Sequence, residues 1–216
     1  MIVSMWMTRE VVTVQPSASV IEVAKLMADR RIRRLPVVEM SAEGALVVGI
    51  VSARDILHAF PPDVNPFAIV APTATTAPVT VEHIMSHQVQ TVAPEDPIET
   101  AAELMAEQKI GALPVIRNGR LAGLITESDI FRAFASFFSS AQCTARITFD
   151  VSGDEDVFTW LSRETKRRKL RINSLISSQQ DNVPVCVVRV AGHAVDELLE
   201  DLWNSGHRVL NVLRYP

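Results

Sequence analysis

The first sixty residues carry a pattern of apolar and polar positions that predicts the order strand, helix, strand, strand, helix. A β-branched run at 11–14 ends before Pro16, as is typical of a short strand. Apolar side chains at helical spacing follow at Val20, Val23, Ala24 and Met27. Two short aliphatic runs, 35–38 and 46–51, predict a pair of strands, and residues 55–60 predict a second helix.

The same pattern returns when the chain is moved by 78 residues, the separation of Met7 from Met85. This offset aligns MTREVVTVQP (7–16) with MSHQVQTVAP (85–94), and AKLMADRRIRRLPVV (24–38) with AELMAEQKIGALPVI (102–116). After four extra residues in the first copy, around Met40-Ser41-Ala42-Glu43, GIVSARDIL (49–57) aligns with GLITESDIF (123–131). The chain therefore contains an internal repeat.

Two copies of this length predict two similar lobes, residues 1–60 and 80–138, packed face to face about a pseudo-twofold axis. Solenoids differ in using many repeats at periods of about 20–50 residues. Residues 61–79 lie between the lobes and are rich in Pro, Thr and Ala. Because proline removes a helix donor and clashes with the preceding turn, we expect an extended linker there.

Residues 143–216 do not repeat this pattern. Alternating or β-branched runs predict strands at 145–151, 170–179, 183–191 and 207–215, and amphipathic runs predict helices at 154–169 and 195–204. The order βαββαβ is that of a ferredoxin-like sandwich, in which helices cover one face of an antiparallel sheet. The fold class predicted for the whole chain is therefore α+β.

Composition and charge narrow the functional classes. The formal net charge of -4 gives no electrostatic reason to expect nucleic-acid binding. The first residues lack the basic start of a signal peptide and no run reaches about 18 apolar residues, so we expect a cytoplasmic protein without a membrane span. Five scattered histidines form no catalytic pattern, and Cys143 and Cys186 have neither disulfide nor zinc spacing. We therefore predict that the protein is not an enzyme and holds no metal or cofactor.

Both copies place a hydroxyl residue three positions before an aspartate at the end of a strand: Ser52 with Asp55, and Thr126 with Asp129. One interpretation is structural, because this is the spacing of a helix N-cap with an acid at the third position. The other is functional. Helix N–H groups favour phosphate, a hydroxyl adds a hydrogen bond, and a carboxylate can accept hydrogen bonds from the two hydroxyls of a ribose.

Similar spacings occur at Ser19-Val20-Ile21-Glu22 and Asp96-Pro97-Ile98-Glu99, where we expect capping boxes at the starts of the long helices.

The repeated LPVV/LPVI strand and the GIVSARD/GLITESD turn resemble a pair of CBS domains, the Bateman module, over roughly residues 1–138. The resemblance implies a regulatory module that binds AMP, ADP, ATP or S-adenosylmethionine in clefts between the two copies. It implies phosphate contacts for Ser52 and Thr126, and ribose contacts for Asp55 and Asp129. It also implies that aliphatic residues enclose the base, and the predicted set is Val12, Val14, Leu35, Pro36, Val92, Leu113 and Pro114. Ala112 is a further predicted ligand-binding residue.

The two copies differ in their cationic residues. Arg54 precedes Asp55 in the first copy, whereas Ser128 occupies that position in the second. Arginine suits phosphate oxygens. We therefore predict that the cleft using Ser52, Arg54 and Asp55 binds phosphate more tightly.

Further arginines precede the Leu-Pro of the first copy only. Arg33 and Arg34 stand where the second copy has Gly111 and Ala112. For these two, a role in ligand binding and a role as solvated cations at a helix end are both open. Arg30 and Arg31 are interpreted as solvated cations.

The βαββαβ tail resembles an ACT domain, a family that binds amino acids or similar effectors at subunit interfaces. Its first loop has Gly153 but lacks the family's Pro, and its three acids, Asp154, Glu155 and Asp156, would repel an amino-acid carboxylate. An amino-acid site near Gly153 and a dimerisation or partner-binding sheet are the two alternatives. The KRRK run at 166–169 lies at a helix end, where cations are stabilising, so it does not indicate nucleic-acid binding.

A CBS pair followed by an ACT-like tail resembles the acetoin-utilisation proteins of the AcuB type. We therefore predict a homodimeric sensor that relays ligand binding through its assembly or through an unknown target protein. The alternative is a structural adaptor with empty clefts, whose C-terminal sheet recruits a partner. Nucleic-acid binding through the arginine cluster would show a steep salt dependence, and the net charge argues against it.

Overall fold

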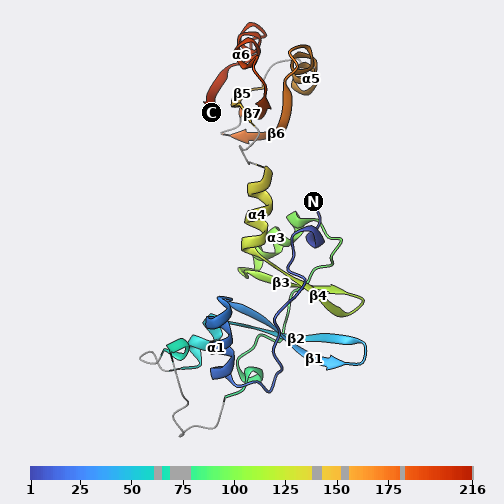
Figure 1. The fold of residues 1–216 in the computed structure, drawn as a ribbon, viewed down its shortest axis with the longest axis vertical. Helices are drawn as coiled ribbons and strands as arrows, with labels where there is room; N and C mark the ends of the chain where they lie inside the picture. Colours follow the sequence, from blue (N-terminus) through green and yellow to red (C-terminus); the bar gives the residue numbers. More distant parts are fainter. Residues whose placement is uncertain (61–64, 69–78, 138–142, 152–155, 181–182, 216) are drawn as a thin grey trace. The chain divides into compact units, whose positions relative to one another are not determined.

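The computed structural model describes residues 1–60, 65–68, 79–137, 143–151, 156–180 and 183–215 (Figure 1). It divides into two compact units, Met1–Ala133 and Phe134–Pro216. The prediction of an α+β chain is confirmed. Most of the predicted linker 61–79, and the loop around Gly153, lie outside the described residues.

In the first unit each copy contributes a long helix, an antiparallel hairpin and a second helix. The first copy contains α1 (Val20–Arg30), β1 (Arg34–Ser41), β2 (Gly44–Ser52) and α2 (Ala53–His58). The second contains α3 (Ile98–Gln108), β3 (Ala112–Arg117), β4 (Arg120–Thr126) and α4 (Glu127–Phe137), the last of which continues past the unit boundary. Short 3₁₀ turns lie at Val3–Met5, Pro66–Ala68 and Val81–His83.

The repeat is preserved in backbone detail. Each hairpin shifts register once, between Val37 and Val38 in β1 and between Val115 and Ile116 in β3. The extra residues of the first copy lengthen the end of its hairpin. Glu43 in that hairpin accepts a hydrogen bond from Arg120 of the other hairpin, with 2.6 Å between Oε2 and Nη2.

The strand predicted at 11–14 is not formed. Val14 makes a single parallel bridge to Val37, and Val92 makes the equivalent bridge to Val115. The Val14 N–H donates to the carbonyl of Pro36 at 3.1 Å, and its carbonyl accepts from the N–H of Val38 at 2.9 Å. The segment is extended, but it pairs with one edge over too short a length to count as a strand.

The start of each copy crosses to the other copy. The Val3 N–H donates to the carbonyl of Asp96, and Thr8 forms an antiparallel bridge with Leu124. In the equivalent exchange, the Val81 N–H donates to the carbonyl of Ala18, and residues 86 and 50 form a bridge. Figure 1 shows the blue N-terminal segment running beside β3 and β4. The predicted lobes 1–60 and 80–138 therefore exchange their first residues, which a local reading of the sequence did not indicate.

The core of the first copy follows from its apolar periodicity. The predicted face of α1 is buried, with Val20, Val23, Ala24 and Met27 each at most 2% exposed. Val81 belongs to the same cluster, although it comes from the start of the second copy. The exchange therefore contributes an apolar side chain to the core as well as backbone hydrogen bonds.

The second unit contains β5 (Ala145–Asp150), α5 (Val157–Arg167), β6 (Arg171–Gln180), β7 (Val183–Ala191), α6 (Val195–Asn204) and β8 (Val209–Arg214). The predicted order βαββαβ is thus observed. Its antiparallel sheet has the strand order β6-β7-β5-β8. Its core includes the fully buried Ile147, Phe149, Leu161, Leu198 and Leu202. Within the described part of the chain, no helix is long and apolar enough to cross a membrane.

The capping boxes expected at the two long helices are absent. Ser19 is the N-cap of α1 but makes no side-chain cap hydrogen bond. Pro97 is the N-cap of α3, and Asp96 instead accepts a hydrogen bond from the N–H of Ala93 at 2.7 Å. Both predictions were therefore wrong. The N–H of the first residue of each helix is instead held by another segment: that of Val20 donates to the carbonyl of Val79, and that of Ile98 to the carbonyl of Met1.

Candidate functional site

The repeated hydroxyl and aspartate form the same hydrogen-bonded turn in both copies. Oδ2 of Asp55 accepts from the backbone N–H and the hydroxyl of Ser52, each at 2.7 Å, and the Asp55 N–H donates back to the Ser52 Oγ at 3.3 Å. Oδ2 of Asp129 accepts from the N–H and hydroxyl of Thr126 at 2.8 and 2.6 Å. The structural interpretation of this spacing is therefore correct in both copies, and any ligand contact would be made by residues that also cap a helix.

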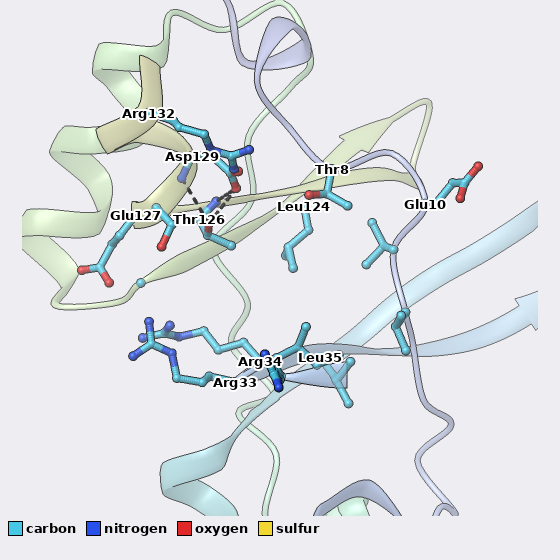
Figure 2. Close-up of a pocket in the computed structure, with 16 residues that line it drawn as sticks. Thr8, Glu10, Arg33, Arg34, Leu35, Leu124, Thr126, Glu127, Asp129 and Arg132 are labelled. Carbon is cyan, nitrogen blue, oxygen red and sulfur yellow. Dashed lines mark hydrogen bonds and ion pairs between the residues drawn. The ribbon is translucent and has the colours of Figure 1, made fainter. Parts of the chain in front are cut away.

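Each of these turns opens onto a cleft of about 450 Å³ between the two copies. The cleft that we call the Thr126 cleft is lined by Thr8, 10–12, 31–35, Gly111, Leu124, 126–129 and Arg132 (Figure 2). The Ser52 cleft is lined by Arg34, Ile50, Ser52, Arg54, Asp55, Ser86, 88–90, 108–110 and Ala112. Both volumes fall within the range of small-molecule sites, about 300–1,000 Å³.

Each cleft is lined by residues from both copies. Thr126 and Asp129 come from the second copy, but the segments 8–12 and 31–35 that face them come from the first. The Ser52 cleft reverses this, since 86–90 and 108–112 belong to the second copy. Figure 2 shows Arg33 and Arg34 on the lobe opposite Thr126 and Asp129.

Most of the predicted ligand residues line a cleft, but not in the predicted groups. Val12, Arg33 and Leu35 lie in the Thr126 cleft, Arg54 and Ala112 lie in the Ser52 cleft, and Arg34 lies in both. The sequence left two roles open for Arg33, ligand binding and a solvated cation at a helix end. The structure places Arg33 opposite Thr126.

Five predicted base contacts line neither cleft. They are Val14, Pro36, Val92, Leu113 and Pro114. All five are buried, and Val14 and Val92 are held in their backbone bridges. We therefore leave them out of the site. In β1 and β3 four consecutive residues are buried, 35–38 and 112–115, so both faces of these strand segments are covered.

Charge differs between the clefts. The Thr126 cleft has four arginines, at positions 31, 33, 34 and 132, against the carboxylates of Glu10, Glu127 and Asp129. The Ser52 cleft has Arg34, Arg54 and Lys109 against the single carboxylate of Asp55. The Ser52 cleft therefore carries the larger net positive charge, although it lacks Arg33.

The two aspartates also differ in what holds them. Oδ1 of Asp129 is in contact with the Nη2 of Arg132, one turn further along α4. His58 is the equivalent residue of the first copy, and among the described residues Asp55 makes no such ion pair. A ribose hydroxyl would thus meet an acceptor oxygen at Asp55, whereas at Asp129 it would compete with a guanidinium.

Sequence reasoning missed several lining residues that come from the exchanged segments. Thr8 and Glu10 face the Thr126 cleft, and the equivalent Ser86 and Gln88 face the Ser52 cleft. The available signal was the repeated Met-hydroxyl pair, Met7-Thr8 and Met85-Ser86, which lies outside every predicted helix and strand. Its place beside the other copy depends on tertiary packing.

The charged and sulfur-bearing residues of the second unit take part in its own structure. Glu164 contacts Arg163, Arg167 and Arg168. The hydrogen bond from Arg163, followed by that from Arg168, holds the pKa of its carboxyl below the usual value. Arg167 also contacts Asp201 on α6. The KRRK run therefore joins α5 to α6, which agrees with its interpretation as a helix-end feature.

The cysteines are also internal. Cys143 and Cys186 are buried and unpaired with each other, and burial raises the pKa of the Cys186 thiol to about 11. Over the described ranges, no cluster of three or more His, Cys, Asp or Glu residues could hold a metal ion.

A family model described as the CBS domain matches residues 3–62 and 81–136, more than half of the chain. The chain therefore belongs to the CBS-domain family, and the prediction of tandem CBS domains is confirmed. The resemblance of the second unit to an ACT domain stays a prediction.

The known proteins that are similar to this chain include the following three. Protein MJ1225 of Methanocaldococcus jannaschii is 35% identical over 132 residues, which cover 60% of this chain and 46% of that protein. The chain thus spans less than half the length of this curated relative. The CBS domain pair of protein MJ0100, solved in complex with 5′-methylthioadenosine and S-adenosyl-L-methionine, has a TM-score of 0.50 and 26% identity, covering 63% of this chain and 97% of that one. A protein named as an acetoin utilization protein (AcuB), from Vibrio cholerae, has a TM-score of 0.52 and 28% identity, covering 65% of this chain and 94% of that one.

Proposed function

We propose that this protein is a non-catalytic sensor that binds an adenine nucleotide or adenosyl ligand in the clefts of its CBS pair. The observation that carries the proposal is the presence of two clefts of suitable size, each ending at a hydroxyl–aspartate turn. The adenosyl ligands bound by the MJ0100 domain pair support the same ligand class. Ligands of this class are AMP, ADP, ATP and S-adenosylmethionine, and the protein would relay their binding to its assembly or to a target protein.

The turn at Ser52 suits a ribose phosphate if one proton moves. The single proton of the Ser52 hydroxyl points to Asp55 in the free protein. Because phosphate oxygens accept hydrogen bonds, this proton would turn to the ligand, while the Ser52 N–H keeps its bond to Asp55. Asp55 would then accept from the ribose hydroxyls through Oδ1.

We propose the Ser52 cleft as the tighter phosphate site. The support is the excess of three cations, Arg34, Arg54 and Lys109, over one carboxylate. Charge-assisted hydrogen bonds to phosphate are about twice as strong as neutral ones. In the Thr126 cleft three carboxylates offset the arginines, which favours ligands of lower negative charge such as S-adenosylmethionine.

We also propose that the protein is a homodimer. Leu57 in α2 and Phe131 in α4 occupy equivalent positions of the repeat and are 48% and 73% exposed. Each is an apolar side chain left on the surface, of the kind that a second copy could cover. Light scattering at micromolar concentration tests this, and a monomeric mass would contradict it.

The turn geometry favours one competing function, a structural adaptor in which both turns serve only as helix caps. Calorimetric titration of the full chain with AMP, ADP, ATP and S-adenosylmethionine separates the two. A sensor should bind at least one of them, and Asp55→Ala or Asp129→Ala should abolish binding at the affected cleft.

The matched control is Asp96→Ala. Asp96 also holds a backbone N–H in a turn of the second copy, but it lines neither cleft. This variant should lose stability and keep its ligand affinity. If no ligand gives heat and all three variants lose stability, both turns have a purely structural role. The functional site would then have to lie in the second unit.

A further inference from the structure

One residue lies in the walls of both clefts. Arg34 is the single residue that the two sets of lining residues share in the described part of the chain. It begins β1, and its Cα is paired with that of Ser52 in the hairpin ladder. Its backbone therefore stands beside the hydroxyl end of the Ser52 cleft.

The guanidinium of Arg34 reaches the other cleft. A Cβ placed on Gly111 would lie 2.3 Å from Nη2 of Arg34 and 2.5 Å from Oε2 of Glu127. Both end groups therefore occupy the space that a larger residue at 111 would fill, and they lie close to each other. Gly111 and Glu127 both line the Thr126 cleft, and Glu127 directly follows Thr126.

Among the described residues of the CBS pair, this arrangement occurs once. The position of Arg34 in the second copy is Ala112, which pairs with Thr126 as Arg34 pairs with Ser52. Alanine has no side chain that could reach from one cleft to the other. Arg33, the neighbour of Arg34, lines the Thr126 cleft alone.

We propose that Arg34 couples the two clefts because its guanidinium serves one bound anion at a time. This inference rests on the proposed function. A phosphate beside Ser52 would attract Arg34 away from Gly111 and Glu127. The Thr126 cleft would then keep three arginines against three carboxylates, so an anionic ligand would bind there more weakly. The reverse effect has the same size, because coupling between two binding equilibria is reciprocal.

The test is a calorimetric cycle with AMP on the full chain. Asp55→Ala leaves only the Thr126 cleft able to bind, and Asp129→Ala leaves only the Ser52 cleft, so each variant gives the affinity of its intact cleft alone. In the wild type the overall constant for two AMP molecules should fall below the product of these two affinities, by on the order of fivefold or more. In the Arg34→Gln background, the overall constant and the product of the two single-cleft affinities should agree within about twofold.

Arg33→Gln is the matched control. It removes an adjacent arginine from the Thr126 cleft only, so it should weaken that cleft and leave the coupling factor unchanged. Asp129→Asn, which keeps the shape of the side chain, replaces Asp129→Ala if the alanine variant does not fold.

Two outcomes would overturn the proposal. One is a wild-type constant equal to the product of the single-cleft affinities. The other is a coupling factor that persists in Arg34→Gln, since this would assign the effect to general repulsion between two bound anions. If the wild type takes one AMP and Arg34→Gln takes two, the coupling is supported in its strongest form. Absence of AMP heat from the wild type and all variants would remove the proposed function itself, and the coupling with it.

Discussion

Met7 lies directly against Gly123: a Cβ at position 123 would be 2.6 Å from the Sδ of Met7. The equivalent pair, Met85 and Gly49, has a corresponding distance of 2.4 Å. The glycine that opens each repeated GIVSARD or GLITESD stretch is therefore the place where the start of the other copy crosses. These contacts explain why a strand keeps a residue without a side chain at this position.

Alanine at Gly123 should destabilise the first unit more than alanine at Gly49. At 123 the new Cβ would also lie 2.9 Å from the backbone carbonyl of Thr8, whereas at 49 the nearest atoms all belong to the flexible side chain of Met85. We expect a loss of about 1–3 kcal/mol for Gly123→Ala, as for overpacked cores, and a smaller loss for Gly49→Ala. Urea denaturation of the two variants measures this, and equal losses would contradict the crossing geometry.

Removing a hydroxyl should destabilise the protein only where it caps a helix. Ser52→Ala should cost about 1 kcal/mol, because Ser52 forms a complete capping box with Asp55. Ser19→Ala should cost clearly less, since Ser19 occupies the same kind of position without a side-chain bond. Denaturation curves of both variants check this. An equal loss of stability in Ser19→Ala and Ser52→Ala would contradict the conclusion that Ser52, and not Ser19, caps its helix through a side-chain hydrogen bond.

Glycine at position 109 should stabilise the fold and weaken the Ser52 cleft. Lys109 ends α3 with φ 54°, a left-handed conformation that costs a non-glycine residue about 1–2 kcal/mol. After the greater freedom of glycine in the unfolded chain is subtracted, Lys109→Gly should gain about 0.5–1 kcal/mol. It also removes a cation from the cleft, so AMP affinity should fall.

Arg31→Gly is the control for that prediction. Arg31 ends α1 with the same φ of 54° but lines the Thr126 cleft. It should give a similar gain in stability and leave AMP binding by the Ser52 cleft unchanged. A stability gain without any change in AMP affinity for Lys109→Gly would remove Lys109 from the site.

Acid should weaken the contribution of Glu164 to the second unit. Its folded pKa is lowered below the ordinary value of 4.5 by Arg163 and Arg168. Its stabilisation is therefore fully present above pH 4.5 and is lost as the pH falls through the lower, folded pKa. At pH 7, Glu164→Gln should lower the urea concentration at the unfolding midpoint of this unit. The difference from the wild type should shrink in acid. Hydrogen exchange of α5 peptides measures the local stability of this helix. A stability difference between variant and wild type that grows in acid would contradict the expected pH dependence.

The sequence by itself determined the local elements and the repeat. The apolar spacing of α1, the hairpins and the βαββαβ order were all predicted within a few residues, because each follows from side-chain periods of 3.6 or 2. The hydroxyl–aspartate turns were identified for the same reason: their partners are three residues apart. The lack of capping boxes at Ser19 and Asp96 already shows the limit of local reasoning.

Only the tertiary structure decided which residues meet across the pair. The exchange of the segments around Thr8 and Ser86 places the arginines of one copy opposite the aspartate of the other, so Arg33 faces Asp129 rather than Asp55. The amino-acid sequence is the same whether Arg33 faces Asp129 or Asp55. The choice depends on backbone hydrogen bonds and apolar contacts between segments far apart in the sequence, from 36 residues for Ile50 and Ser86 to 116 residues for Thr8 and Leu124. No local period records such contacts.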